Sequence, residues 1–230
     1  MYIIEGNIGA GKSTFVKLIG EHIPQINTAL EPLNNWQKQV YGQSLLTNFY
    51  QNTKRWAYTL ETLTMICRAR EHINLQKQDS ITHIAERSLY SGHYCFALNS
   101  YEQGFMSALE WEIYLQWFSW LVHNKCQVPN GFIYLRVDPS IAYERIKKRN
   151  RHAEKTISLG YLKQIHEKHE QFLVKKKDLL PGLDQVPVLI LDCNKEFASD
   201  LEQLSKHMEQ VKQFVNNPLN HKEPQWQKSI

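Results

Sequence analysis

A glycine-rich stretch near the start of the chain constrains its fold more than any other feature. Residues 6–14 read GNIGAGKST and match the pattern G-x-x-x-x-G-K-[ST] without a mismatch. A short β-favouring run precedes the stretch, and apolar residues at helical spacing follow it. In this strand–loop–helix order, backbone N–H groups and the helix N-terminus point at one anion. The predicted nucleotide site comprises Gly6, Asn7, Ile8, Gly9, Ala10, Gly11, Lys12, Ser13 and Thr14.

Two side chains of this loop have distinct expected tasks. Lys12 would reach the outer phosphates of the nucleotide, and the hydroxyl of Ser13 would bind Mg²⁺. The pattern predicts nucleotide binding, and it leaves open what the nucleotide is used for.

The length and charge of the chain limit the classes of protein to which it can belong. Its 230 residues suit one α/β domain, expected over 1–215 and followed by a flexible tail over 216–230. The net charge is only +4, and basic residues concentrate at 145–155 and 175–177, which favours local anion sites over nucleic-acid binding. The four cysteines stand far apart, which is typical of a reducing compartment. With no apolar run of membrane-spanning length and no room for a leader, we expect a cytoplasmic protein without a membrane partner.

Strand-like and helix-like segments alternate along the chain. Strands are predicted at 2–4, 27–30, 81–85, 132–137 and 187–192. Helices are predicted at 13–19, 54–77, 106–123, 140–149, 159–180 and 198–215, with an irregular or helical insertion at 34–52. This order predicts an α/β fold of the P-loop NTPase type, in which a parallel five-stranded sheet has helices on both faces. Ligands then collect at the carboxyl ends of the strands.

Charged residues follow two of the predicted strands. Phosphoryl transfer to a small acceptor needs a base for the acceptor hydroxyl, a metal, and cations over the migrating charge. Glu31 is placed to be the base, although a helix cap would use the same residue type. Glu86 could bind Mg²⁺ and Arg87 could hold the transferring phosphoryl group, although such a pair can also be a plain surface ion pair.

A cluster of arginines lies where a predicted helix runs into a polar loop. Arg145, Arg149 and Arg151 follow one another at spacings of four and two. Cations also suit a helix C-terminus, which is the simpler explanation. The functional alternative is a lid over about 145–156 that brings arginines onto the phosphates.

Several separate motifs resemble one known family. Besides the glycine stretch they are Glu31-Pro32, Arg55-Trp56, Glu86-Arg87-Ser88, Tyr134-Leu135 and residues 145–161. They recur in this order in the deoxyribonucleoside kinases, which group deoxycytidine and deoxyguanosine kinases, mitochondrial thymidine kinase and the insect multisubstrate enzyme. The resemblance, which runs from residue 2 to about 215, implies transfer of the terminal phosphoryl group of Mg-ATP to the 5′-hydroxyl of a deoxyribonucleoside. It also implies a homodimer paired through long helices such as 106–123, although that aromatic stretch could be ordinary core.

The resemblance also implies roles for single residues. Glu31 matches the base that takes the proton of the sugar 5′-hydroxyl, Arg87 the arginine that steadies it, and Glu86 the metal-linked glutamate. Tyr50 and Glu154 match the pair that hydrogen-bonds the 3′-hydroxyl. The other matches are the lid arginines Arg145, Arg149 and Arg151, the base-pocket aromatics Trp36 and Phe96, and Phe197 near the base of the donor.

Two positions depart from that family. Glu61 stands where the family has a glutamine that reads the base edge, and Gly92 stands where deoxycytidine and deoxyguanosine kinases have an aspartate. An ionised carboxylate only accepts hydrogen bonds and guanine presents two adjacent donors, so Glu61 favours guanine. Arg68 lies on the same helical face and could donate to guanine O6 or N7, and Gly92 would leave room for a larger base. In the alternatives, Glu61 pairs with Arg68 or is protonated, and the enzyme prefers pyrimidines or accepts all bases.

Two other functions compete with this one. A nucleoside monophosphate kinase needs cations for an acceptor phosphate, whereas Glu31, Glu61 and Glu154 would repel it. A regulatory nucleotide switch is suggested by Asn194-Lys195-Glu196, but Phe197 breaks the guanine-reading pattern N-K-x-D. A switch would also have no need of a carboxylate base.

Overall fold

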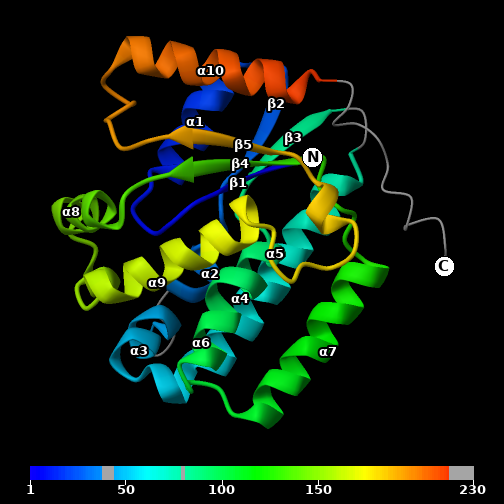
Figure 1. Cartoon of the computed structure of the whole chain (residues 1–230), viewed down its shortest axis with the longest axis vertical. Helices are drawn as coiled ribbons and strands as arrows, with labels where there is room; N and C mark the ends of the chain where they lie inside the picture. The colour runs from blue at the N-terminus through cyan, green and yellow to red at the C-terminus, as the bar shows by residue number, and fades with distance from the viewer. Residues whose placement is uncertain (38–43, 79–80, 218–230) are drawn as a thin grey trace.

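One parallel sheet forms the centre of the molecule (Figure 1). The computed structural model describes residues 1–37, 44–78 and 81–217. The strands are β1 (Tyr2–Glu5), β2 (Ile26–Ala29), β3 (Thr82–Glu86), β4 (Gly131–Arg136) and β5 (Val188–Asp192). They lie in the order β2-β3-β1-β4-β5, and every neighbouring pair is parallel. The predicted five-stranded parallel sheet is confirmed.

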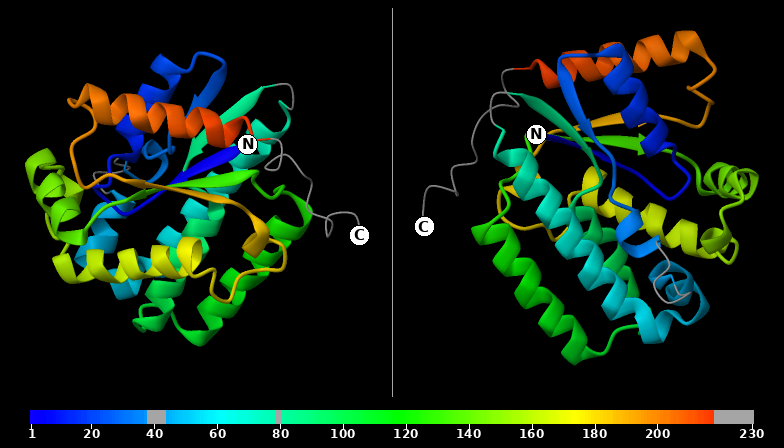
Figure 2. Two further views of the ribbon diagram at one scale, coloured as in Figure 1. Left: turned by 45° about the horizontal axis from the view of Figure 1, so that its top comes forward. Right: turned by 180° about the vertical axis from the view of Figure 1, so that it is seen from behind.

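Alternate side chains of the central strands enter two separate cores. Ile3 and Phe132 lie in one core, whereas Ile4 and Ile133 lie in the other. This follows from the two-residue period of a strand, which makes a sheet buried on both faces apolar at every position. Helices α1 (Lys12–His22) and α10 (Leu201–Val215) cover one face, and α4 (Thr53–Gln76) and α7 (Ala108–Asn124) lie on the other side (Figures 1 and 2). The expectation of helices on both faces is therefore confirmed.

Shorter helices complete the fold. They are α2 (Asn34–Gln37), α3 (Leu45–Gln51), α5 (Leu89–Ser91), α6 (Leu98–Glu102), α8 (Pro139–Arg149) and α9 (Leu159–His169). A π-helical segment, Gly92–Ala97, joins α5 to α6, and another, Glu170–Val174, extends α9. Single turns of 3₁₀ helix lie at His152–Glu154 and Leu183–Gln185. The predicted insertion at 34–52 contains α2 and α3, and its residues 38–43 lie outside the described part of the chain.

Two sequence predictions need correction here. The helix predicted over 159–180 ends at Val174, because Lys176 and Asp178 adopt positive φ values of 50° and 52° that no helix can continue. Residues 89–102, for which the sequence predicts no element, form successive helical segments that begin after the cap residue Ser88. Of the tail predicted over 216–230, residues 218–230 lie outside the described part.

The carboxyl ends of the parallel strands meet at one edge of the sheet. The glycine loop leaves β1 there, Glu31 follows β2, and Arg87 follows β3. Ligands of open parallel sheets bind at this edge, which is where the predicted chemistry gathers.

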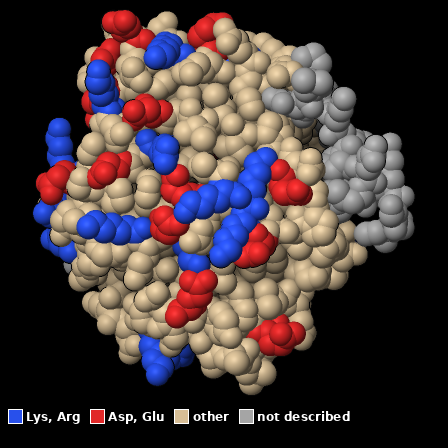
Figure 3. Space-filling model, in the orientation of Figure 1, with Lys and Arg blue, Asp and Glu red and all other residues tan. Residues whose placement is uncertain are grey.

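The surface carries mixed charge. On the face shown in Figure 3, Lys and Arg side chains lie next to Asp and Glu side chains. Within residues 1–37, 44–78 and 81–217, no helix combines the length and the apolar character that crossing a membrane requires.

Candidate active site

The glycine loop is shaped by contacts that exclude side chains. Gly9 has a φ of 82°, and a Cβ atom there would lie 2.5 Å from the carbonyl oxygen of Ala142. Helix α1 begins directly after the loop at Lys12 and has no side-chain cap, so its first N–H groups remain available to an anion. Asn7 donates from Nδ2 to the carbonyl of Leu162 over 2.9 Å, which ties the loop to α9.

The ammonium group of Lys12 points back into this loop. Its Nζ donates to the carbonyl oxygens of Gly6 and Asn7 over 3.1 and 2.8 Å. Burial lowers the pKa of Lys12 to about 7, and the nearby Arg87 acts in the same direction. A negatively charged ligand would favour the ammonium form.

The side chains of Ser13 and Glu86 meet beside the loop. The Ser13 hydroxyl donates to Oε1 of Glu86 over 2.8 Å, and the backbone N–H of Glu31 donates to Oε2 over 3.3 Å. Among the described residues, no group of three or more His, Cys, Asp or Glu could hold a metal. A hydroxyl and one carboxylate suit Mg²⁺, which commonly completes its octahedron with phosphate oxygens and water.

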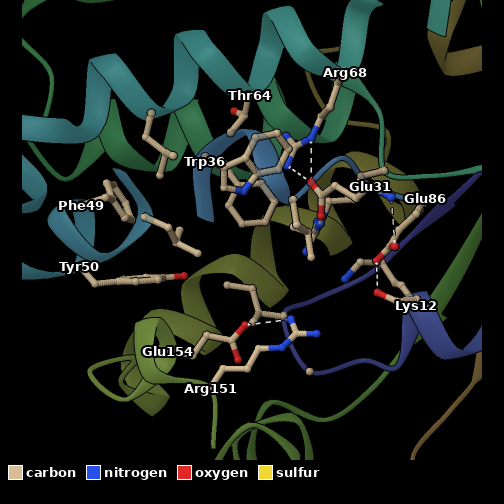
Figure 4. A pocket seen from close by; sticks show the side chains of 18 of the residues that line it. Lys12, Glu31, Trp36, Phe49, Tyr50, Thr64, Arg68, Glu86, Arg151 and Glu154 are labelled. Atoms are coloured by element: carbon tan, nitrogen blue, oxygen red, sulfur yellow. Dashed lines mark hydrogen bonds and ion pairs between the residues drawn. The ribbon is translucent and has the colours of Figure 1, made fainter. Parts of the chain in front are cut away.

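The carboxylate of Glu31 is clamped between two buried arginines. Arg68 donates from Nε and Nη2 to Oε1 of Glu31 over 3.0 and 2.6 Å (Figure 4). On the other side, Nε of Arg87 lies 3.5 Å from Oε2 of Glu31. Burial alone would raise the pKa of Glu31, but the two guanidinium groups outweigh it and hold the pKa below its usual value. Glu31 is therefore an ionised carboxylate at neutral pH.

Arg87 occupies an unusual backbone position. Its φ is 63°, in the left-handed region, while its backbone N–H donates to the carbonyl of Ile4 over 2.9 Å. Such conformations in residues other than glycine cost about 1–3 kcal/mol and cluster at functional sites. The turn aims the Arg87 side chain at Glu31 and stacks its guanidinium 4.7 Å from the ring centre of Phe96.

One pocket connects the glycine loop with an aromatic region. In Figure 4, Lys12 and Glu86 lie at one end of it, Phe49 and Tyr50 at the other, and Glu31 between them. It brings together most of the predicted site residues: Ile8, Gly9, Gly11, Lys12, Ser13, Thr14, Glu31, Trp36, Tyr50, Glu61, Arg68, Glu86, Arg87, Phe96, Arg149, Arg151 and Glu154.

Two residues of the predicted lid line the pocket, and a third does not. Arg149 and Arg151 both approach Glu154, with Nη2 of Arg149 at 2.5 Å from Oε2. Arg145 instead donates from Nη2 to the carbonyls of residues 193, 194 and 195 over 3.0–3.2 Å. In this structure the guanidinium of Arg145 therefore holds the loop after β5, and its role at the phosphates stays a prediction.

That loop carries the predicted donor-base residue. Phe197 is buried against the rings of Phe15 and His207, and its Cζ would lie 2.9 Å from a Cβ atom at Gly11. Phe197 therefore packs behind the glycine loop and does not line the pocket.

The structure also differs from the expected roles of Arg68 and Gly92. Arg68, which is expected to donate to a guanine base, donates from Nε and Nη2 to Glu31 in this structure, and its contact with a base stays a prediction. A Cβ atom at Gly92 would lie 2.7 Å from Nη1 of Arg68, so the space expected for a larger base is filled by this arginine. A side chain at position 92 would therefore require this end of the Arg68 guanidinium to shift.

Sequence reasoning missed several pocket residues: Leu33, Leu46, Phe49, Leu60, Thr64 and Tyr161. Thr64 could have been found, because it follows Glu61 by three residues and precedes Arg68 by four on one face of α4. The others are apolar or aromatic and look like ordinary core residues in the sequence.

Comparisons with known proteins agree with this geometry. A model of the deoxynucleoside kinase family matches residues 2–216. The chain is 34% identical to deoxycytidine kinase 2 of Gallus gallus over 93% of its own length and 89% of that protein. It is 34% identical to human deoxycytidine kinase, covering 93% of the chain and 90% of that protein. It is also 34% identical to the mitochondrial deoxyguanosine kinase of Xenopus laevis, covering 92% and 88%. The chain therefore belongs to the deoxynucleoside kinase family, and the predicted kinase class is confirmed.

Proposed function

We propose that this member of the deoxynucleoside kinase family transfers the terminal phosphoryl group of ATP to the 5′-hydroxyl of a deoxyribonucleoside, in nucleotide salvage. The observation that carries the proposal is the Glu31 carboxylate, which two arginines keep ionised in the same pocket as the phosphate-binding loop. An ionised, oriented carboxylate within reach of an acceptor hydroxyl is the arrangement needed for general-base catalysis.

The phosphate end of the pocket would hold Mg-ATP. The N–H groups of the glycine loop and the ammonium of Lys12 bind the phosphates. Ser13 and Glu86 would hold Mg²⁺, which neutralises charge on the β- and γ-phosphate oxygens when bound. Phe197, packed behind Gly11, supports the loop around the adenine.

The acceptor would lie with its 5′-hydroxyl at Glu31. Glu31 takes the proton of that hydroxyl, while Arg87 steadies Glu31 and the migrating phosphoryl group. Burial raises the pKa of Tyr50, so its phenol stays a neutral donor that, with Glu154, can bind the 3′-hydroxyl. Trp36 and Phe96 line the space for the base.

The lid would act through Arg149 and Arg151. Both side chains lie at the mouth of the pocket and are about two-fifths exposed (36% and 41%), so they can turn from Glu154 to the phosphates. Closure of the segment 145–156 over ATP would exclude water from the transfer.

We also propose that the protein works as a homodimer in the cytoplasm. Four apolar residues of α7 are exposed at helical spacing: Leu109, Ile113, Trp117 and Trp120. An apolar stripe of this kind on a long helix suits pairing with the same stripe of a second copy. The four cysteines are all free and buried, which supports a reducing compartment.

The direct test is an assay of the four deoxyribonucleosides and of deoxycytidine monophosphate with ATP and Mg²⁺. We expect 5′-monophosphates from at least one nucleoside, and poor use of the monophosphate because the carboxylates of Glu31 and Glu154 line the acceptor side. A better rate with the monophosphate would replace the proposal by a nucleoside monophosphate kinase. ATP binding without turnover of any acceptor would favour a nucleotide switch.

A further inference from the structure

Four glutamates line the pocket, and Glu61 is the one that has no role in the proposed phosphoryl transfer. It lies on α4, two helical turns from Arg68, which corresponds to about 10 Å along the helix axis. The residue is only 4% exposed but lines the pocket together with Trp36 and Phe96. Since Arg68 reaches the catalytic carboxylate, Glu61 lies toward the part of the pocket where a base would lie.

The arginines near Glu61 are directed elsewhere. Arg68 on the same helix and Arg87 after β3 both pair with Glu31. Glu61 takes part in none of the ion pairs among the described residues. Its carboxyl group therefore has no cation at contact distance, although the charges of both arginines still act on it from further away.

The other groups that face Glu61 come from four further elements. They are the phenols of Tyr50 (α3), Tyr114 (α7) and Tyr161 (α9) and the hydroxyl of Ser100 (α6). Burial raises the pKa of all three tyrosines, so they stay neutral across the working range of pH. Burial likewise raises the pKa of Glu61 to about 8, against the opposing effect of the arginines. A neutral carboxyl group dominates at pH 7.

We propose that Glu61 determines base specificity through its proton: the neutral carboxyl accepts every base, and the ionised carboxylate accepts guanine. This inference rests on the proposed nucleoside kinase activity. A neutral carboxyl presents one O–H donor beside one C=O acceptor, as an amide presents N–H₂ beside C=O. That pair matches N3 and N4–H₂ of cytosine, N1 and N6–H₂ of adenine, N3–H and O4 of thymine, and N1–H and O6 of guanine.

The ionised carboxylate of Glu61 can pair with fewer bases than the neutral carboxyl group. Its two oxygens only accept, and guanine alone offers two adjacent donors, N1–H and the 2-amino group. Cytosine and adenine would each place a ring nitrogen lone pair against the second oxygen, which is repulsive. Deoxyguanosine should therefore bind in both states, while deoxycytidine and deoxyadenosine lose affinity as Glu61 ionises.

The test measures kcat/KM for deoxyguanosine, deoxycytidine and deoxyadenosine from about pH 6.5 to about pH 8.5. Taking the ratio of two nucleosides in one enzyme cancels the titrations that they share, such as those of Lys12 and ATP. With a Glu61 pKa of about 8, the deoxyguanosine-to-deoxycytidine ratio should rise about four-fold or more over this range, mainly through KM. In Glu61→Gln, which keeps one donor and one acceptor but cannot titrate, the ratio should stay flat.

Each result decides the matter. A rising ratio in the wild type and a flat one in Glu61→Gln supports the inference. A flat ratio in an active wild type, or an equal rise in both proteins, overturns it and leaves the kinase proposal standing. Failure to phosphorylate any nucleoside overturns the proposed function first and this inference with it.

Discussion

The two ends of the pocket are built in different ways. The phosphate end, which comprises residues 6–14 and Glu86, takes most of its binding groups from consecutive backbone N–H groups at the start of α1. The base end, as we call the part proposed to hold the nucleoside base, comprises Trp36, Glu61 and Phe96, whose side chains come from α2, α4 and the π-helical segment. Glu31 lies between the two ends. Arg68 connects α4, which lines the base end, with Glu31 through two hydrogen bonds. A ligand class can be fixed by one short backbone motif, whereas substrate choice depends on distant side chains.

The largest effect is expected at the phosphate end. Lys12→Met should lower kcat by about 10²- to 10³-fold, because it removes a cation preorganised over the phosphates. In the free protein the pKa of Lys12 is about 7, so near pH 7.5 much of it is neutral, and binding an anionic triphosphate should draw in a proton. Calorimetry in buffers of different ionisation enthalpy would measure this uptake.

Lys17→Met, on the exposed side of α1, is the matched control for that variant. It should retain both turnover and proton uptake. Equal uptake in Lys12→Met and the wild type would show that another group titrates.

A smaller effect is expected where the two ends are coupled. Arg68→Met should lower kcat about ten-fold at neutral pH, a size typical of groups that orient a reacting side chain. Arg68 lowers the pKa of Glu31, so its removal raises that pKa, and the acid limb of the kcat profile should move to higher pH. Arg70→Met, exposed on the same helix, is the control. An acid limb at the same pH in Arg68→Met and the wild type would show that Arg68 does not set the pKa of the catalytic base.

A milder change at Gly92 tests the same coupling without removing a charge. In Gly92→Ala the new Cβ would lie 2.7 Å from Nη1 of Arg68, so the guanidinium must move. We expect kcat to fall by about two- to five-fold, with triphosphate affinity unchanged. Gly160→Ala, where the nearest atom is an ordinary 3.7 Å away, should leave both values as they are. A wild-type kcat in Gly92→Ala would mean that Arg68 tolerates displacement.

The smallest effect on chemistry is expected far from both ends. Trp117→Asp on α7 should change kcat per active site by less than about two-fold, because independent sites contribute separately. It should nevertheless convert the proposed dimer to a monomer, since it places a charge in an apolar interface. Sedimentation velocity at several concentrations would measure the change in mass. A variant with the same mass as the wild type would show that the dimer interface does not include Trp117.

The phosphate end of the pocket could be predicted from the sequence better than the contacts around Arg68 and the base end. Residues 6–14 and the parallel five-stranded sheet follow from local patterns, and Glu31, Glu86 and Arg87 follow from their places after strands. The contact between Arg68 and Glu31 does not follow from local patterns, because the two residues lie 37 positions apart in the chain. The spacing of Arg145 predicts a contact with the phosphates, whereas in this structure it donates to carbonyls 48–50 residues further on. Spacing along one helix cannot show which distant chain segment completes a contact.

The sequence left the protonation of Glu61 open between an ionised and a neutral carboxyl group. The residue type suggested an ionised acceptor, and only burial, together with the commitment of both arginines to Glu31, indicates otherwise. Protonation depends on the whole surroundings of a group rather than on its neighbours in the chain.

The most direct test of this account is a comparison of Glu31→Gln with the wild type in two assays, ATP affinity and turnover of the preferred nucleoside. If Glu31 is the base that joins the two ends, kcat should fall by about 10²- to 10⁴-fold while ATP affinity stays within about two-fold. Glu21→Gln, exposed in the last turn of α1, should match the wild type in both. Turnover retained in Glu31→Gln would contradict the account, because the carboxylate held by Arg68 and Arg87 would then take no part in the transfer.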